Sequence, residues 1–84
     1  MFYRIYTETK PQLSDLVSKY FDGFTLLYGR GFFLRKSEAC TIIEIDTIEP
    51  HCEARIKCLV RDIKQVCEQE FVLVQKFPTV LHLG

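Results

Sequence analysis

The residues best suited to chemistry lie in one short stretch, YGRGFFLRK, at positions 28–36. Gly29 and Gly31 flank Arg30, whose guanidinium group can hold a phosphate or a carboxylate by charge-assisted hydrogen bonds. A phosphate loop needs a helix N-terminus directly behind its glycines, and here a hydrophobic strand follows instead. Glycine inside a strand more often marks a bulge, a bend or a close approach of another chain segment. We therefore expect a bent strand at this point, with Gly29, Arg30 and Gly31 as candidate contacts of a ligand or partner.

The same stretch is similar to the first ribonucleoprotein motif of RNA-recognition domains, because Arg30-Gly31-Phe32-Phe33 follows the basic, glycine, aromatic pattern. That motif belongs on a third strand, whereas these residues follow the first helix almost directly. The chain carries eleven acidic and eleven basic side chains, so no net charge attracts nucleic acid. Nucleic-acid binding is disfavoured, and RNA binding stays an alternative.

Histidine, cysteine and serine occur in no recognisable catalytic or metal-binding setting. The four cysteines (Cys40, Cys52, Cys58 and Cys67) include no Cys-x-x-Cys pair, and His51 beside Cys52 is the only metal-like pairing. We expect thiols in or near the core. The sequence therefore predicts no metal, no cofactor and no enzymatic activity.

Length and hydropathy set the broad class. Eighty-four residues suit a single domain, 1–84. No run approaches the roughly 20 apolar residues that span a bilayer, and the N-terminus lacks a basic leader. We expect a cytoplasmic protein without a membrane partner.

Periodicity predicts six elements. Residues 1–8, 24–35, 40–47 and 71–77 are typical of strands, and helical stripes of apolar residues follow Pro11 and span Cys52 to Cys67. Thr9 is the expected cap of the first helix, and KSEA, residues 36–39, is the expected connection between the second and third strands. With right-handed crossovers this order predicts an α+β ferredoxin-like sandwich (βαββαβ), in which a four-stranded antiparallel sheet carries two helices on one face.

Alternation along the strands then assigns the two faces of the sheet. With Arg35 paired to Cys40, Phe33 faces Ile42 and Gly31 faces Glu44. We expect Phe24, Leu26, Tyr28, Phe32 and Leu34 to pack under the helices. The uncovered face, which we call the open face, carries Phe2, Arg4, Tyr6, Leu27, Phe33, Ile42, Glu44, Leu73, Gln75 and Phe77. A largely apolar solvent face usually marks an interface, so we predict a homo-oligomer, a dimer or a trimer, built on these residues.

Two family resemblances cover much of the chain. FYRIYTE, DGFTLLYGRGFF, TIIEID and QEFVLV together resemble small uncharacterised proteins of bacteria, phages and mobile elements. This resemblance implies roles for Gly23, Gly29, Gly31, Glu44, Gln69 and Glu70, and it adds Gln69 and Glu70 to the candidate ligand or partner contacts. The same region is similar to PII-like and CutA-like regulators, which implies a ferredoxin-like trimer. KSEA is too short to replace the nucleotide-binding loop of such regulators.

The leading functional hypothesis is a non-enzymatic interaction or regulatory protein that acts as an oligomer on a protein partner. The phage resemblance suggests an inhibitor of a host defence system, of the anti-CRISPR type. The alternatives are a PII-like regulator that binds a small ligand or nucleotide near Gly29–Gly31, and an RNA-binding module.

Overall fold

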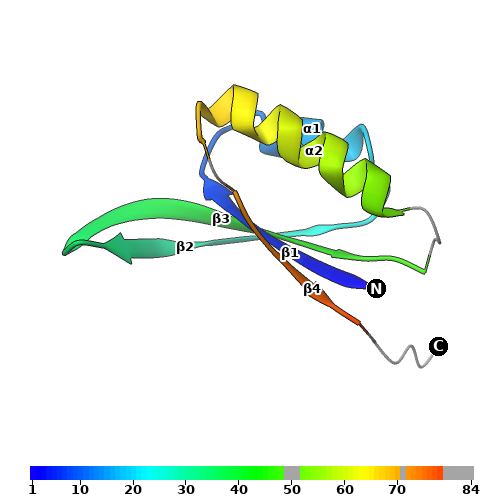
Figure 1. Cartoon of the computed structure of the whole chain (residues 1–84). Coiled ribbons are helices and arrows are strands. Elements are labelled where there is room, and N and C mark those ends of the chain that lie inside the picture. The colour runs from blue at the N-terminus through cyan, green and yellow to red at the C-terminus, as the bar shows by residue number, and fades with distance from the viewer. Residues whose placement is uncertain (49–51, 71, 79–84) are drawn as a thin grey trace.

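The computed structural model describes residues 1–48, 52–70 and 72–78, and within these ranges the side chain of Phe33 is not described. Its elements are β1 (Phe2–Glu8), α1 (Leu13–Ser18), β2 (Thr25–Phe33), β3 (Lys36–Asp46), α2 (Cys52–Cys67) and β4 (Leu73–Phe77). The four strands form one antiparallel sheet in the order β2-β3-β1-β4. Both helices lie on the same side of that sheet (Figure 1). The predicted α+β ferredoxin-like fold is confirmed.

The core forms where the apolar stripe of α2 meets the covered face of the sheet. In β1 every second residue is buried, as period-two alternation requires, and Tyr3 and Ile5 point toward the helices. On α2, Ile56, Leu59 and Ile63 recur at spacings of three and four and are also buried. Each such side chain stabilises the fold by roughly 1.5–3 kcal/mol, so this interface anchors the sheet to its helices.

The first helix is shorter than the apolar stripe predicts, and Thr9 does not cap it. Gln12 occupies the N-cap position and makes no capping hydrogen bond with its side chain. Tyr20 lies beyond the last helical turn, but its hydroxyl donates a hydrogen bond to a carboxylate oxygen of Asp62 on α2. Arg55 of α2 donates to the Tyr20 carbonyl oxygen at 3.1 Å. The end of α1 is therefore tied to α2 by polar contacts.

The connection between β2 and β3 is a two-residue turn, so the expected KSEA loop is wrong. Leu34 and Arg35 have φ angles of 50° and 64°, the left-handed pair that a tight hairpin turn requires. Lys36 is already in β3 and pairs with Phe33. The expected register is therefore shifted by six residues, since Gly31 pairs with Glu38 and not with Glu44. An even shift leaves every side chain on the face that alternation assigns to it.

No bulge marks the two glycines of β2. The pairing of β2 with β3 runs without interruption from Thr25 to Phe33, and neither glycine has a positive φ. A Cβ atom at Gly31 would meet nothing within 4 Å, and one at Gly29 would lie 3.8 Å from the Cys40 sulfur. The glycines therefore mark no bulge, and backbone geometry does not demand either of them. Within the described ranges, no helix is long and apolar enough to cross a membrane.

Candidate functional site

The β2–β3 hairpin projects beyond the rest of the sheet (Figure 1). β1 ends at Glu8, which pairs with Cys40, whereas β3 continues back to Lys36 with β2 as its only described neighbour. We call residues 30–39 the arm. Tyr28, at the base of the arm, and Phe32 and Leu34 within it are 71%, 76% and 78% exposed. Our prediction that these three pack under the helices is wrong, because the hairpin extends past the helices.

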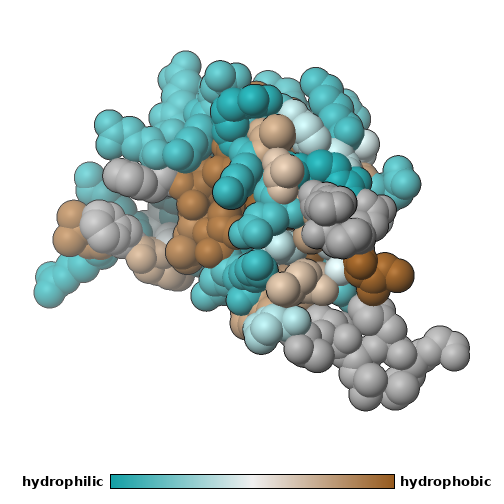
Figure 2. Space-filling model, turned by 45° about the vertical axis from the view of Figure 1, so that its right-hand side comes forward, coloured by the Kyte–Doolittle hydropathy of each residue, from teal (hydrophilic) through white to brown (hydrophobic). Residues whose placement is uncertain are grey.

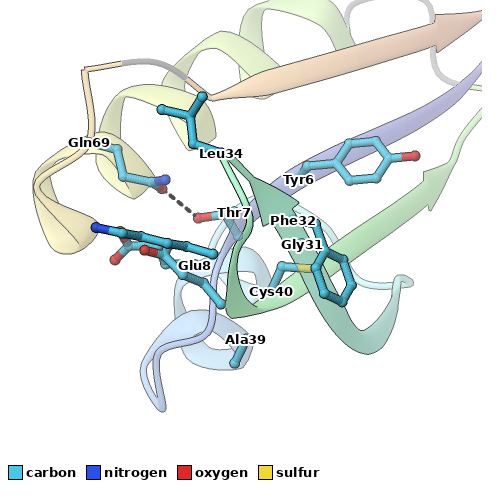
Figure 3. A pocket seen from close by; sticks show the side chains of 11 residues that line it. Tyr6, Thr7, Glu8, Gly31, Phe32, Leu34, Ala39, Cys40 and Gln69 are labelled. Carbon is cyan, nitrogen blue, oxygen red and sulfur yellow. Dashed lines mark hydrogen bonds between the residues drawn. The ribbon is translucent and has the colours of Figure 1, made fainter.

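A pocket of about 470 Å³ lies where the arm leaves β1, and we call it the arm pocket. Figure 3 shows the labelled side chains around it, with Tyr6 from β1, Phe32 from β2 and Gln69 from the segment after α2. Its volume is within the usual range for small-ligand sites, about 300–1,000 Å³. The overhang of β3 past β1 also leaves one edge of residues 36–39 unpaired among the described strands. Backbone N–H and C=O groups on that edge are available to a ligand.

Charged and aromatic side chains gather in the arm pocket. Glu8 and Glu38 bring carboxylates to the lining, and Lys36 brings one ammonium group. Phe32 and Tyr6 bring aromatic rings. Rings stack on flat heterocycles and attract cations over their faces, and carboxylates bind cations directly. The combination therefore suits a flat ligand that carries a positive charge.

Gln69 is held at the pocket by a buried threonine. Thr7, on the covered face of β1, donates a hydrogen bond from its hydroxyl to Gln69 Oε1 at 2.9 Å. The same hydroxyl lies 3.5 Å from the sulfur of buried Cys67, the last residue of α2. Because Glu68 has a φ of 52°, the chain turns sharply between α2 and Gln69. The contacts of Thr7 thus fix the wall of the pocket to the end of α2.

A second polar cluster lies on the open face. The Arg4 guanidinium donates from Nε and Nη2 to Glu44 Oε2 at 3.0 and 2.8 Å. It also lies 5.5 Å from the ring centroids of Phe2 and Phe77, which are 5.5 Å from each other. The hydrogen bonding with Glu44 is the main reason why the pKa of Arg4 is raised above its usual value. The guanidinium is therefore a fixed cation in an aromatic setting.

Apart from Phe33, whose side chain the structure does not describe, the observed register places the open-face residues on the same side of the sheet. Leu27, Leu73 and Phe77 are 44%, 59% and 38% exposed. Tyr6 donates a hydrogen bond to Gln75 Oε1 at 3.2 Å, so part of the polar surface is satisfied internally. An apolar face with its polar groups already paired has the composition of an interface. The interface role of these residues stays a prediction.

The structure places only two of the five candidate ligand or partner contacts named from sequence at the arm pocket. Gly31 and Gln69 line the arm pocket. Gly29 lies beside Cys40 on the open face, and Arg30 donates to Ser37 Oγ at 2.9 Å on the opposite face of the arm. Glu70 is exposed. None of these last three lines the pocket.

Sequence reasoning missed most of the pocket. Glu8, Phe32, Lys36, Glu38 and Cys40 all line it, and none was a candidate ligand contact. The signal was present only as Lys36 and Glu38 within KSEAC, which is too short to point to a site. Among the described residues, no group of three or more histidine, cysteine or acidic side chains is placed to hold a metal ion.

Comparison with known proteins finds relatives by structure alone. No family model matches the sequence, and no curated protein matches it. A solved phage SAM lyase in the apo state superposes with a TM-score of 0.61 at 15% identity, covering 87% of this chain and 75% of that one. A phage SAM lyase in complex with S-methyl-5′-thioadenosine superposes with a TM-score of 0.53 at 15% identity, over 87% of this chain and 76% of that one. At this identity the likeness establishes a shared fold.

The neighbours correct one prediction and support another in part. Our expectation that the chain is not an enzyme is contradicted, because both solved structures described above, which share its fold, are those of an enzyme. The expected link to phage proteins fits the neighbours, whereas the PII-like and CutA-like resemblances stay predictions. This chain has the fold of a phage-encoded SAM lyase.

Proposed function

We propose that the chain binds S-adenosylmethionine, or a related 5′-thioadenosine, in the arm pocket and cleaves it as a lyase. One observation carries the proposal: two carboxylates and two aromatic rings line a ligand-sized pocket in a chain that has the fold of a SAM lyase. The ligand has a flat adenine and a sulfonium cation. Each of these two groups has a counterpart in the pocket.

Each part of the ligand has a partner in this assignment. The exposed Phe32 ring stacks on the adenine, a contact worth roughly 1–3 kcal/mol. Glu38 and Glu8 face the sulfonium, and the unpaired backbone edge of residues 36–39 supplies hydrogen bonds to polar atoms of the nucleoside. In the lyase step a carboxylate base removes a proton from the carbon next to the carbon bonded to sulfur, and the electrons of that C–H bond form a C=C bond. The S–C bond breaks with its electrons on sulfur, so S-methyl-5′-thioadenosine leaves as a neutral thioether, and the protein has mainly to orient the ligand for this step.

Titration calorimetry with S-adenosylmethionine and with S-methyl-5′-thioadenosine tests the binding step. Phe32→Ala weakens both ligands, by roughly tenfold or more if stacking is lost. Glu38→Gln keeps the shape of the side chain but removes its charge, so it weakens the cationic ligand more than the neutral one. Tyr28→Ala is the matched control, because Tyr28 is equally exposed on the same face of β2 and does not line the pocket. Equal effects of Phe32→Ala and Tyr28→Ala would contradict the assignment.

Chromatography of S-adenosylmethionine incubated with the protein tests the cleavage step. We expect S-methyl-5′-thioadenosine to appear with the native chain and to decrease with Glu38→Gln. Binding without any product would leave the chain as a nucleoside-binding regulator, and the absence of both would refute the proposal.

We also propose that the chain self-associates through the open face. This association is supported by exposed Leu27, Leu73 and Phe77 around the Arg4–Glu44 pair. Burying one such side chain is worth roughly 2 kcal/mol, so several of them would sustain an oligomer. Sedimentation of Leu73→Asp should show a smaller species, whereas Ile48→Asp, at an even more exposed apolar residue outside the strands, should leave the mass unchanged. A native chain that is monomeric at high concentration would exclude this assembly.

An inhibitor role toward a host defence protein is a further candidate, supported by exposed Phe32 on the arm and exposed Tyr28 at its base. Tyr28→Ala separates it from the nucleoside function, since Tyr28 lies outside the pocket. Loss of a protein complex with retained nucleoside affinity would favour the inhibitor role.

A further inference from the structure

A second groove lies at the edge of the sheet opposite to β2, between α2 and the edge strand β4. We call it the edge groove. It has a volume of about 400 Å³ and an apolar floor formed by Tyr3, Ile56, Val60 and Val74. Figure 2 shows an apolar area on one side of the molecule, with hydrophilic side chains above it. None of the functions considered so far uses this groove.

The rim of the edge groove is strongly basic. Lys57, Arg61 and Lys64 stand along one face of α2, and Lys76 stands opposite them on β4. Four of the eleven basic side chains of a neutral chain therefore surround one hollow. Glu53 is the acidic residue of the lining, and its carboxylate lies 3.7 Å from Lys76 Nζ. The groove favours an anionic occupant.

Two of these cations have no ionic partner within the described chain. Arg61 pairs with Asp62 at 3.2 Å and Lys76 pairs with Glu53. Lys57 and Lys64 form no ion pair with any residue that the structure describes, and both are exposed. Their spacing of seven residues places them on one side of α2, about 10 Å apart along the helix axis. Acidic side chains four residues apart in an extended chain lie on the same face, about 13 Å from each other, and the flexible lysine side chains can reach both.

The edge of β4 supplies the remaining feature. β4 is the last strand of the sheet, and only β1 pairs with it among the described residues. Alternate N–H and C=O groups of such a strand point outward and can accept another strand. The groove runs along α2 from Glu53 to Lys64, about 16 Å, which is the length of about five extended residues. β4 is itself five residues long.

We propose that the edge groove binds an extended acidic peptide segment of a partner protein, which adds to β4 as a fifth strand. The side chains of the peptide that face α2 lie at every second position. A central one is apolar and packs on the floor formed by Val60 and Val74, and the acidic ones two residues before and after it meet Lys57 and Lys64 on the rim. Main-chain hydrogen bonds to β4 supply affinity, and the basic rim selects the sequence. Nucleic acid fits less well, because the floor offers aliphatic side chains and a buried tyrosine instead of exposed rings for stacking.

Fluorescence anisotropy with a labelled peptide of about seven residues, Thr-Glu-Thr-Val-Thr-Glu-Thr, tests this assignment, because its two glutamates and its valine share one face of an extended chain. The double variant Lys57→Glu/Lys64→Glu should weaken binding about tenfold or more, because two exposed ion pairs become repulsive. Lys10→Glu, a charge reversal outside the groove, should stay within about twofold. A peptide with lysine in place of glutamate should bind at least about tenfold more weakly to the native chain.

Two further measurements separate strand addition from other modes. Backbone N-methylation of alternate peptide residues should abolish binding, and hydrogen exchange should slow at β4 amides in the complex. Equal affinity for the lysine peptide, or for the methylated peptide, would overturn the proposal. So would tighter binding of a single-stranded oligonucleotide, or a change in oligomeric mass of Lys57→Glu/Lys64→Glu, which would make the groove a contact between copies. The double variant should keep its affinity for S-adenosylmethionine, because neither lysine lines the arm pocket. A loss of peptide binding can then be ascribed to the edge groove.

Discussion

Replacing Arg35 by glycine should stabilise the protein, because the two-residue turn forces this residue into a left-handed conformation. Its φ is 64°, and Leu34 before it has a φ of 50°. Tight hairpin turns of this kind prefer glycine at the second position, where a Cβ atom is strained. The Arg35 side chain is exposed, so its removal sacrifices little packing.

The magnitude follows from two opposing terms. A non-glycine residue in the left-handed region costs roughly 1–2 kcal/mol. Glycine loses about 0.5–1 kcal/mol more than other residues through chain entropy on folding. The net gain for Arg35→Gly is therefore about 0.5–1 kcal/mol. For a chain of this length that corresponds to a rise in melting temperature of about 2–8 °C.

Thermal unfolding followed by circular dichroism measures the effect, with every variant at the same protein concentration because self-association also raises the melting temperature. Arg35→Ala is the matched control, since it removes the guanidinium but keeps the Cβ atom, and it should gain nothing. Arg35→Asn should fall between the two, because asparagine tolerates the left-handed region. A melting temperature of Arg35→Gly at or below that of Arg35→Ala would refute the two-residue turn, and with it the register of the arm.

Three further predictions concern the contacts behind the pocket and the core. Thr7→Val removes the hydroxyl that donates to Gln69, so it should destabilise the chain by about 1 kcal/mol and weaken nucleoside binding; unchanged binding would show that Gln69 holds its place without Thr7. The Tyr20 hydrogen bond holds the pKa of Asp62 below its usual value, so its contribution to stability is present above about pH 4 and is lost as the pH falls through the folded-state pKa. Melting curves of Tyr20→Phe should therefore differ most from those of the native chain near neutral pH and converge with them in acid, and a gap that persists in acid would argue against this linkage. Leu59→Ala, at a fully buried residue of α2, should cost about 2–5 kcal/mol in a denaturant titration, and a loss below about 1 kcal/mol would show that the core closes around the cavity.

Helix and strand positions could be predicted wherever the periodicity is strong. The stripe from Cys52 to Cys67 coincides with α2, because an amphipathic helix buries every third or fourth residue whatever it packs against. The end of the first helix could not be predicted, since Tyr20 and Phe21 continue the apolar spacing while packing from outside the helix. Their positions depend on contacts with α2, such as the Arg55 guanidinium 5.1 Å from the Phe21 ring centroid.

The arm pocket could not be predicted from the residues that form it. Glu8 ends one strand, Glu38 lies near the start of another, and Gln69 follows a helix. Their meeting depends on where β1 stops against β3, which is a property of the pairing between strands. The two-residue turn at Leu34-Arg35 could not be predicted either, because neither residue type signals a left-handed turn. The expected register of the hairpin was wrong for this reason.

The sequence by itself determined which side of the sheet each strand residue occupies, because the side chains of a strand alternate with a period of two and an even change of register preserves that alternation. It also determined the antiparallel order of the elements, since local periodicity and right-handed crossovers leave few arrangements open. Only the tertiary structure decided that β3 runs four residues beyond the end of β1, which exposes Phe32 and opens the arm pocket. It likewise decided that the basic face of α2 lies beside β4, the last described strand of the sheet. Both features arise from pairing and packing between segments far apart in the chain, and local patterns carry no measure of how far one element extends past another.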